Sequence, residues 1–182
     1  MSFRTALFAA AAMAALSACA HSAQPSAAPV SPSPAATSSI PPITVHSRGN
    51  ARQPVRITQQ EGNRRIYELL ARSSESTMQS QSQFRSTFSQ THVTFFTADG
   101  GTLTGDAPLA TIDKASNSVT MQGGVRGKTS EGVVLNCDQL VYERKTGTLH
   151  GTGNVHIVSK EGYALSGGSF TSDLKLTHVH ME

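Results

Sequence analysis

Apolar and polar residues alternate along the chain from His92 onward, and turn-forming sequences interrupt the alternation at short intervals. Val93 and Phe95, for example, precede the sequence TADGG, after which the next apolar positions begin. A period of two is typical of strands that are buried on one face, and short turns containing glycine join such strands into antiparallel hairpins. We therefore predict an all-β fold, an antiparallel meander built from hairpins.

Two stretches of this meander, residues 118–140 and 148–170, repeat one pattern without a gap. The matching pairs are Gly123/Gly153, Val125/Val155, Glu131/Glu161, Gly132/Gly162 and Leu135/Leu165. In the first copy the alternation slips between Cys137 and Leu140, and it slips again between Leu165 and Phe170 in the second. Such slips predict a β-bulge at the same place in each copy, and the first glycine of each copy lies in mid-strand, where glycine is typical of a bend. Each copy is interpreted as a hairpin unit that buries its apolar face by stacking on its neighbours.

The N-terminal part of the chain has a different composition. Arg4 precedes an apolar stretch, and Leu-Ser-Ala-Cys at residues 16–19 resembles a bacterial lipobox, so residues 1–18 are predicted to be a lipoprotein signal peptide and Cys19 the lipidated residue. An ordinary signal peptide with a chance cysteine is the alternative. The apolar stretch is too short for a transmembrane helix, which needs about 20 residues.

Residues 19–62 are rich in Ala, Ser and Pro and then in Arg, a composition that predicts a semi-extended tether. The arginines either lie against an anionic membrane surface or belong to a solvated linker. Residues 63–182 are predicted to form the folded domain, in which 73–90, rich in Ser, Gln and Thr, form an irregular crossing or a weak edge strand.

The chain offers little chemistry. The formal charge is only +3, and no basic stripe is present, so the sequence argues against nucleic acid as a partner. GGVRGKT at 123–129 lacks the spacing of a phosphate-binding loop, and no G-x-S-x-G, H-E-x-x-H or C-x-x-C motif is present. His156, His178 and His180 are either a metal site or polar residues on exposed strands, and Cys137 is interpreted as a buried hydrophobe. No catalytic residue, metal or cofactor is predicted, so the protein is not expected to be an enzyme.

Four short motifs resemble one family, that of the lipopolysaccharide-export protein LptC and its OstA-like relatives. They are V-x-F-F-x-x-D-G at 93–100, G-x-V at 123–125, L-x-C-D-x-L-x-Y at 135–142 and D-L-x-L at 173–176. The resemblance covers roughly residues 66–182 and implies a periplasmic β-jellyroll, open along one side, whose interior carries the acyl chains of lipopolysaccharide.

The resemblance also implies which residues do this. The interior face that would contact lipid comprises Val93, Phe95, Leu103, Val119, Met121, Val125, Leu135, Leu140, Tyr142, Leu149, Val155, Ile157, Leu165 and Phe170. A final strand from Leu174 to Met181 would dock a similar jellyroll through its free edge, with Leu174, Leu176, Val179 and Met181 as the docking residues. An edge protected by Lys175, His178 and His180 is the alternative.

The resemblance further implies the partners. Members of the family bind lipopolysaccharide through its lipid A and pass it from an inner-membrane ABC transporter to a periplasmic jellyroll bridge of the LptA type. We therefore expect a lipid-transfer component in the periplasm, held by the lipidated Cys19 at the inner membrane. Ala20 after that cysteine favours sorting to the outer membrane in enteric bacteria, so the outer membrane stays open. Two other readings also stay open: a scaffolding envelope lipoprotein with a filled β-sandwich core, and a secreted carbohydrate-active β-protein.

Overall fold

The computed structural model describes residues 42–80 and 83–182, and every regular element in these ranges is a β-strand. The strands are β1 (Ile43–Arg48), β2 (Val55–Glu61), β3 (Arg64–Met78), β4 (Phe84–Phe96), β5 (Thr102–Asp113), β6 (Ser118–Thr129), β7 (Val134–Glu143), β8 (Thr148–Val158), β9 (Ala164–Asp173) and β10 (His180–Met181). The predicted signal peptide, the lipidation site Cys19 and residues 20–41 of the predicted tether lie outside the described residues.

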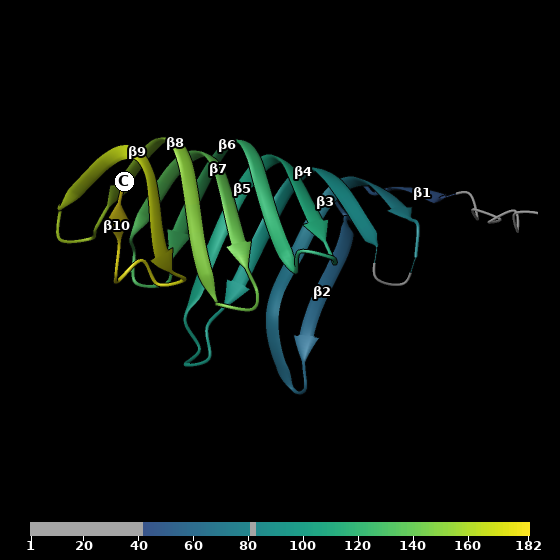
Figure 1. Cartoon of the computed structure of the whole chain (residues 1–182), viewed down its shortest axis with the longest axis horizontal. Coiled ribbons are helices and arrows are strands. Elements are labelled where there is room, and N and C mark those ends of the chain that lie inside the picture. Colours follow the sequence, from purple (N-terminus) through teal and green to yellow (C-terminus); the bar gives the residue numbers. More distant parts are fainter. Residues whose placement is uncertain (1–41, 81–82) are drawn as a thin grey trace, which may run out of the picture. The chain divides into compact units, whose positions relative to one another are not determined.

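The strands form one antiparallel sheet in which each strand from β3 to β10 pairs with the next along the chain (Figure 1). On the other edge of β3, two short strands pair with successive parts of its length. β1 pairs with Ser73–Met78, and β2 pairs with Arg64–Ala71. The predicted all-β antiparallel meander is therefore confirmed, and the sheet is open.

A line of β-bulges crosses the sheet near the middle of its strands. The register shifts at Asp106/Leu109, Gln122/Val125, Asn136/Gln139 and Thr152/Val155. Positive φ angles lie at the same level, 50° at Gln90, 91° at Gly123 and 75° at Gly153. We call this line the crease. The bulges predicted before Leu140 and before Phe170 both lie on it, because the pairing of β8 with β9 skips Gly168.

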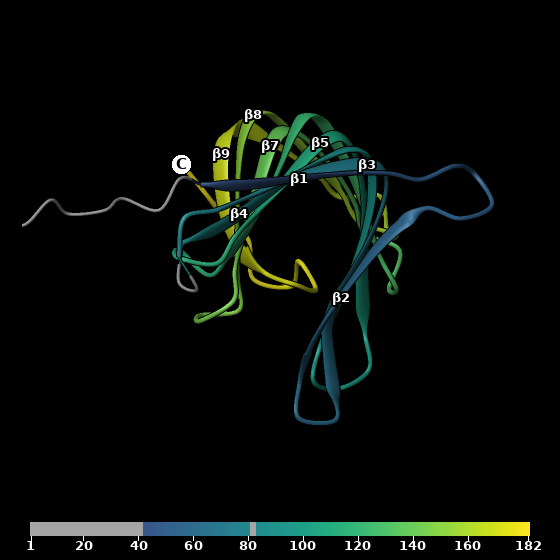
Figure 2. The ribbon, with the colours of Figure 1, turned by 90° about the vertical axis from the view of Figure 1, so that its right-hand side faces the viewer.

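The crease folds the sheet into an arch with two limbs, seen end-on in Figure 2. Each long strand runs up one limb, bends at its bulge and runs down the other. Phe95 and Tyr142 lie on opposite sides of the crease, yet their ring centroids are 4.8 Å apart. Side chains of the two limbs therefore pack against each other, and a single sheet supplies both layers of its own core.

Burial supports the predicted inner face. Thirteen of the fourteen predicted interior residues are at most 5% exposed. Leu165 is the exception at 43%. It lies on β9, whose outer neighbour β10 pairs only with Phe170 and Thr171. The part of β9 that contains Leu165 therefore has no strand on its outer side within the described chain.

The sheet begins earlier than the sequence predicted. Residues 43–48 and 55–61, placed in the tether, are β1 and β2, and residues 73–90, predicted to be irregular or weakly paired, belong mainly to the long strands β3 and β4. Backbone pairing does not require apolar side chains, and here serine hydroxyls also pair across the strands. Ser73 lies 2.6 Å from Ser89, and Ser76 lies 2.7 Å from Ser86, measured between their Oγ atoms.

The predicted strand from Leu174 to Met181 is wrong for most of its length. The Asp173 carboxylate accepts a hydrogen bond from the Thr177 N–H at 2.9 Å, which turns the chain, and Leu176 takes a φ of 57°. Leu174 and Leu176 are only 8% and 6% exposed, so they belong to the core and not to a free edge. Only His180 and Met181 pair with β9.

Substituting a crease glycine tests the importance of the bend. Gly153→Ala places a methyl group against the Asp138 side chain at a φ of +75°, whereas Gly147→Ala, at a φ of +70°, meets no atom within 4 Å. Both variants carry the left-handed penalty of about 1–2 kcal/mol, and only Gly153→Ala adds a steric cost of about 1–3 kcal/mol. Chemical denaturation measures both. Equal losses of unfolding free energy would show that the crease tolerates a side chain.

Candidate functional site: an apolar groove beneath the first strands

Apolar side chains stay exposed on the inner face of the first strands. Residues directly opposite each other in an antiparallel pair point to the same face. Val45 is opposite Ser76, which is opposite the buried Ser86, and Ile43 is opposite Met78. Ile43, Val45 and Met78 therefore point to the inner side, where they are 60%, 53% and 43% exposed.

These strands border a groove of about 750 Å³. Its apolar lining consists of Ile57, Tyr67, Met78, Phe84, Phe88 and Ile112, and its polar lining of Gln59, Ser86, Asp113, Lys114, Asn117, Ser118 and Arg144. The apolar residues come mainly from β2, β3 and β4, and the polar ones gather toward the turns after β5 and β7. The volume lies within the range of about 300–1,000 Å³ that is usual for small-molecule sites.

Small and large side chains alternate with one another on the inner face of β3 and β4. Ser74, Ser76 and Ser86 occupy inward positions next to Phe88 and Met78, and Ser86 lines the groove. Farther along the sheet, large side chains fill the space instead. The Phe170 ring lies where a side chain on Gly151 would be, and the Met121 side chain lies 3.1 Å from the position of a Cβ on Gly105.

None of the fourteen predicted interior residues lines this groove. Thirteen of them form the packed middle of the arch, and Tyr142 among these also borders a second cavity nearer the turns. The groove residues from β2 and from the segment 73–90 were missed because residues 19–62 were interpreted as a tether and residues 73–90 as irregular. The alternation Phe84, Ser86, Phe88 was the available signal, since it places three side chains on one face.

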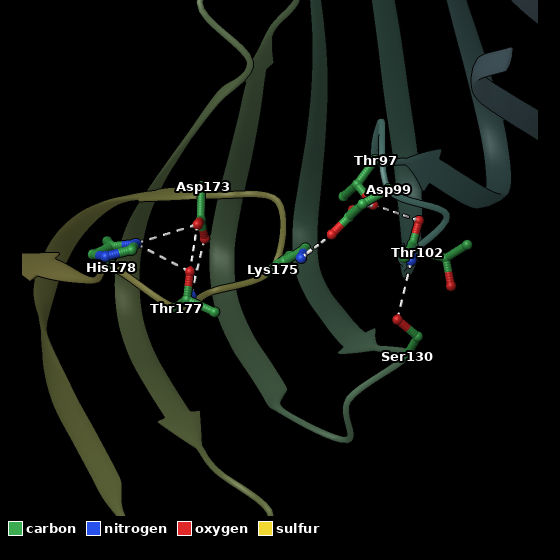
Figure 3. Close-up of polar contacts among 9 residues, drawn as sticks. Thr97, Asp99, Thr102, Ser130, Asp173, Lys175, Thr177 and His178 are labelled. Atoms are coloured by element: carbon green, nitrogen blue, oxygen red, sulfur yellow. Dashed lines mark hydrogen bonds and ion pairs between the residues drawn. The ribbon is translucent and has the colours of Figure 1, made fainter. Parts of the chain in front are cut away.

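The segment 174–179, which we call the strap, follows β9 and lies at the open side of the arch. Leu174 and Leu176 point into the core from it, and Lys175 forms an ion pair with Asp99 in the turn between β4 and β5 (Figure 3). Asp99 and the strap belong to opposite limbs, so this ion pair bridges the mouth of the arch. Thr177 and His178 face Asp173, with 3.5 Å between His178 Nδ1 and an Asp173 oxygen.

Among the described residues, no group of three His, Cys, Asp or Glu side chains is placed to hold a metal ion. His156 instead lies 2.8 Å from the Ser166 hydroxyl, and His178 faces Asp173. Cys137 is buried, and burial raises the pKa of its thiol to about 12, which disfavours the reactive thiolate. Within the described ranges, no helix has the length and hydropathy to span a membrane.

Comparisons with known proteins add no relative. No protein-family model matches the chain, and no curated protein matches it.

The contact between Lys175 of the strap and Asp99 predicts a lowered pKa for the Asp99 carboxyl group. The hydrogen bond from Lys175 lowers the pKa of Asp99 to about 2, so the contact is complete above the ordinary pKa of 3.8 and is lost as the pH falls through about 2. Lys175→Ala should return the Asp99 pKa toward 3.8, whereas Lys128→Ala, on the outer face of β6, should leave it unchanged. A carbon-detected NMR titration of the Asp side chains measures this. An Asp99 pKa near 3.8 in the unmodified protein would contradict the bridge.

Proposed function

We propose that this protein binds acyl chains of an amphipathic lipid in the groove and acts as a lipid-transfer component of lipopolysaccharide export. The observation that carries the proposal is the apolar groove, which is open to solvent beneath the first strands, whereas the middle of the arch is packed. The resemblance of residues 66–182 to the LptC and OstA-like proteins supports the same function.

The groove fits the physical need of a lipid carrier. Each CH₂ group transferred from water into an apolar site is stabilised by about 0.8 kcal/mol. Ile57, Met78 and Phe84 offer such a site, and the exposed Ile43 and Val45 extend the apolar surface beside it. A lipid chain laid along β1 to β4 would cover side chains that otherwise face water.

In this proposal the protein works in the periplasm, anchored through Cys19, between an inner-membrane ABC transporter and an LptA-like jellyroll bridge. Docking of the bridge is assigned to β9, since the strap cannot provide a free edge. Residues 164–168 have no strand on their outer side within the described chain, and Tyr163 and Leu165 are 76% and 43% exposed there. An unpaired edge with apolar side chains favours strand addition.

A scaffolding lipoprotein is the second candidate, and the packed middle of the arch favours it. Leu103, Leu135 and Leu149 are fully buried by the protein's own side chains. Such a core needs no ligand for its stability, so the groove alone separates the two candidates.

A charge in the groove tests lipid binding. Met78→Glu places a carboxylate in the apolar lining, and Thr77→Glu places the same group next to it in the sequence, on the opposite face of β3. A bound acyl chain would cover this carboxylate without solvating it, so Met78→Glu should weaken the binding of fluorescently labelled lipid A at least about tenfold. Thr77→Glu should bind as the unmodified protein does.

Equal binding by the two variants would remove the groove from the site. Absence of saturable binding to the unmodified protein would reject lipid transfer and favour the scaffold. Circular dichroism and thermal unfolding show whether each variant is folded.

A further inference from the structure

A second cavity, of about 550 Å³, adjoins the apolar groove. Asn117 and Arg144 line both spaces. The second cavity lies at the mouth of the arch, between the turn that joins β2 to β3, the turn after β7, and the strap. We call it the mouth cavity.

The mouth cavity has an excess of positive charge. Its lining contains four basic side chains, Arg64, Arg144, Lys145 and Lys175, and two carboxylates, Glu61 and Asp173. Arg64 is paired with Glu61 at 3.1 Å, and Lys175 is paired with Asp99. Asp173 accepts hydrogen bonds from Thr177 and faces His178. Arg144 and Lys145 are the basic residues of this lining that form no ion pair with any described residue.

Arg144 lies where the polar and apolar spaces meet. Tyr67 lines the groove, Tyr142 lines the mouth cavity, and Phe95 packs between them, with ring centroids 6.3 Å and 4.8 Å away. Burial raises the pKa of both tyrosines, and the positive charge of Arg144 opposes that rise in each case. Arg144 lines both spaces and is half-buried at their junction.

We propose that Arg144 and Lys145 bind the phosphate of the lipid whose acyl chain occupies the groove. This inference rests on the proposed function and adds the orientation and head-group class of the ligand. The chain would lie along Ile57, Met78 and Phe84, with the head group in the mouth cavity. A guanidinium donates paired hydrogen bonds to phosphate oxygens, and partial burial reduces the screening of its charge by salt.

Two lipids with identical chains test the head-group site. Dioctanoyl phosphatidic acid and dioctanoylglycerol differ by one phosphate, and isothermal titration calorimetry below their micelle concentrations measures their binding to the full chain. The unmodified protein should bind the phosphatidic acid at least about tenfold more tightly, equivalent to about 1.4 kcal/mol. The double variant Arg144→Gln/Lys145→Gln should reduce this preference to about twofold or less and leave the affinity for dioctanoylglycerol unchanged.

The control is Arg126→Gln/Lys128→Gln, which removes the same two charges from exposed positions on β6. It should retain the tenfold preference. Inorganic phosphate at the same concentration should not displace the phosphatidic acid, because the acyl chain supplies most of the affinity; displacement would show a free-phosphate site and overturn the lipid assignment. Equal losses in the two double variants would show a general charge effect and overturn it too. Binding of both lipids without preference refutes the head-group site alone, whereas binding of neither lipid refutes the groove and the head-group site together.

Discussion

The bend in the middle of each long strand is the constraint on which the rest of the structure depends. Gly123, Asp138, Gly153 and Gly168 follow one another at fifteen-residue intervals, so the bulges of β6 to β9 come into line when the strands pair. A flat sheet with one apolar face would need a second layer to cover it. Bent along the crease, the sheet covers its own face, and the contact of Phe95 with Tyr142 joins the two limbs.

The arch is solid in its middle and hollow beneath the first strands. Phe170 beside Gly151 and Met121 beside Gly105 fill the middle, while Met78, Phe84 and Phe88 border the open groove. The strap adds two leucines to the core. In the proposed function, binding is confined to the groove and the adjoining mouth cavity, where Arg144 and Lys145 provide charge.

The repeat made much of the fold predictable. Alternating apolar residues from Val93 to Phe170 identified the strands and their inner face, and the slips in that alternation located the crease. The groove was not predicted, because β1 and β2 were assigned to the tether and the segment 73–90 to an irregular crossing; serines interrupt the apolar pattern there, and the alternation of Phe84 with Phe88 was its only apolar signal. The strap was mispredicted because Leu174 and Leu176 alternate as in a strand. The hydrogen bond from the Thr177 N–H to the Asp173 carboxylate turns the chain there and prevents a regular strand. The pattern of apolar residues does not reveal such a hydrogen bond.

The central claim is that ligand enters only beneath the first strands of a sheet that is packed elsewhere. Hydrogen–deuterium exchange, measured with and without saturating phosphatidic acid, tests it most directly. The account predicts slower exchange in β1, β2, the first half of β4 and the turn after β7, with exchange within β7 and β8 unchanged. Protection spread evenly along all strands, or strongest in β7 and β8, would contradict it by showing that the packed middle opens to admit the lipid.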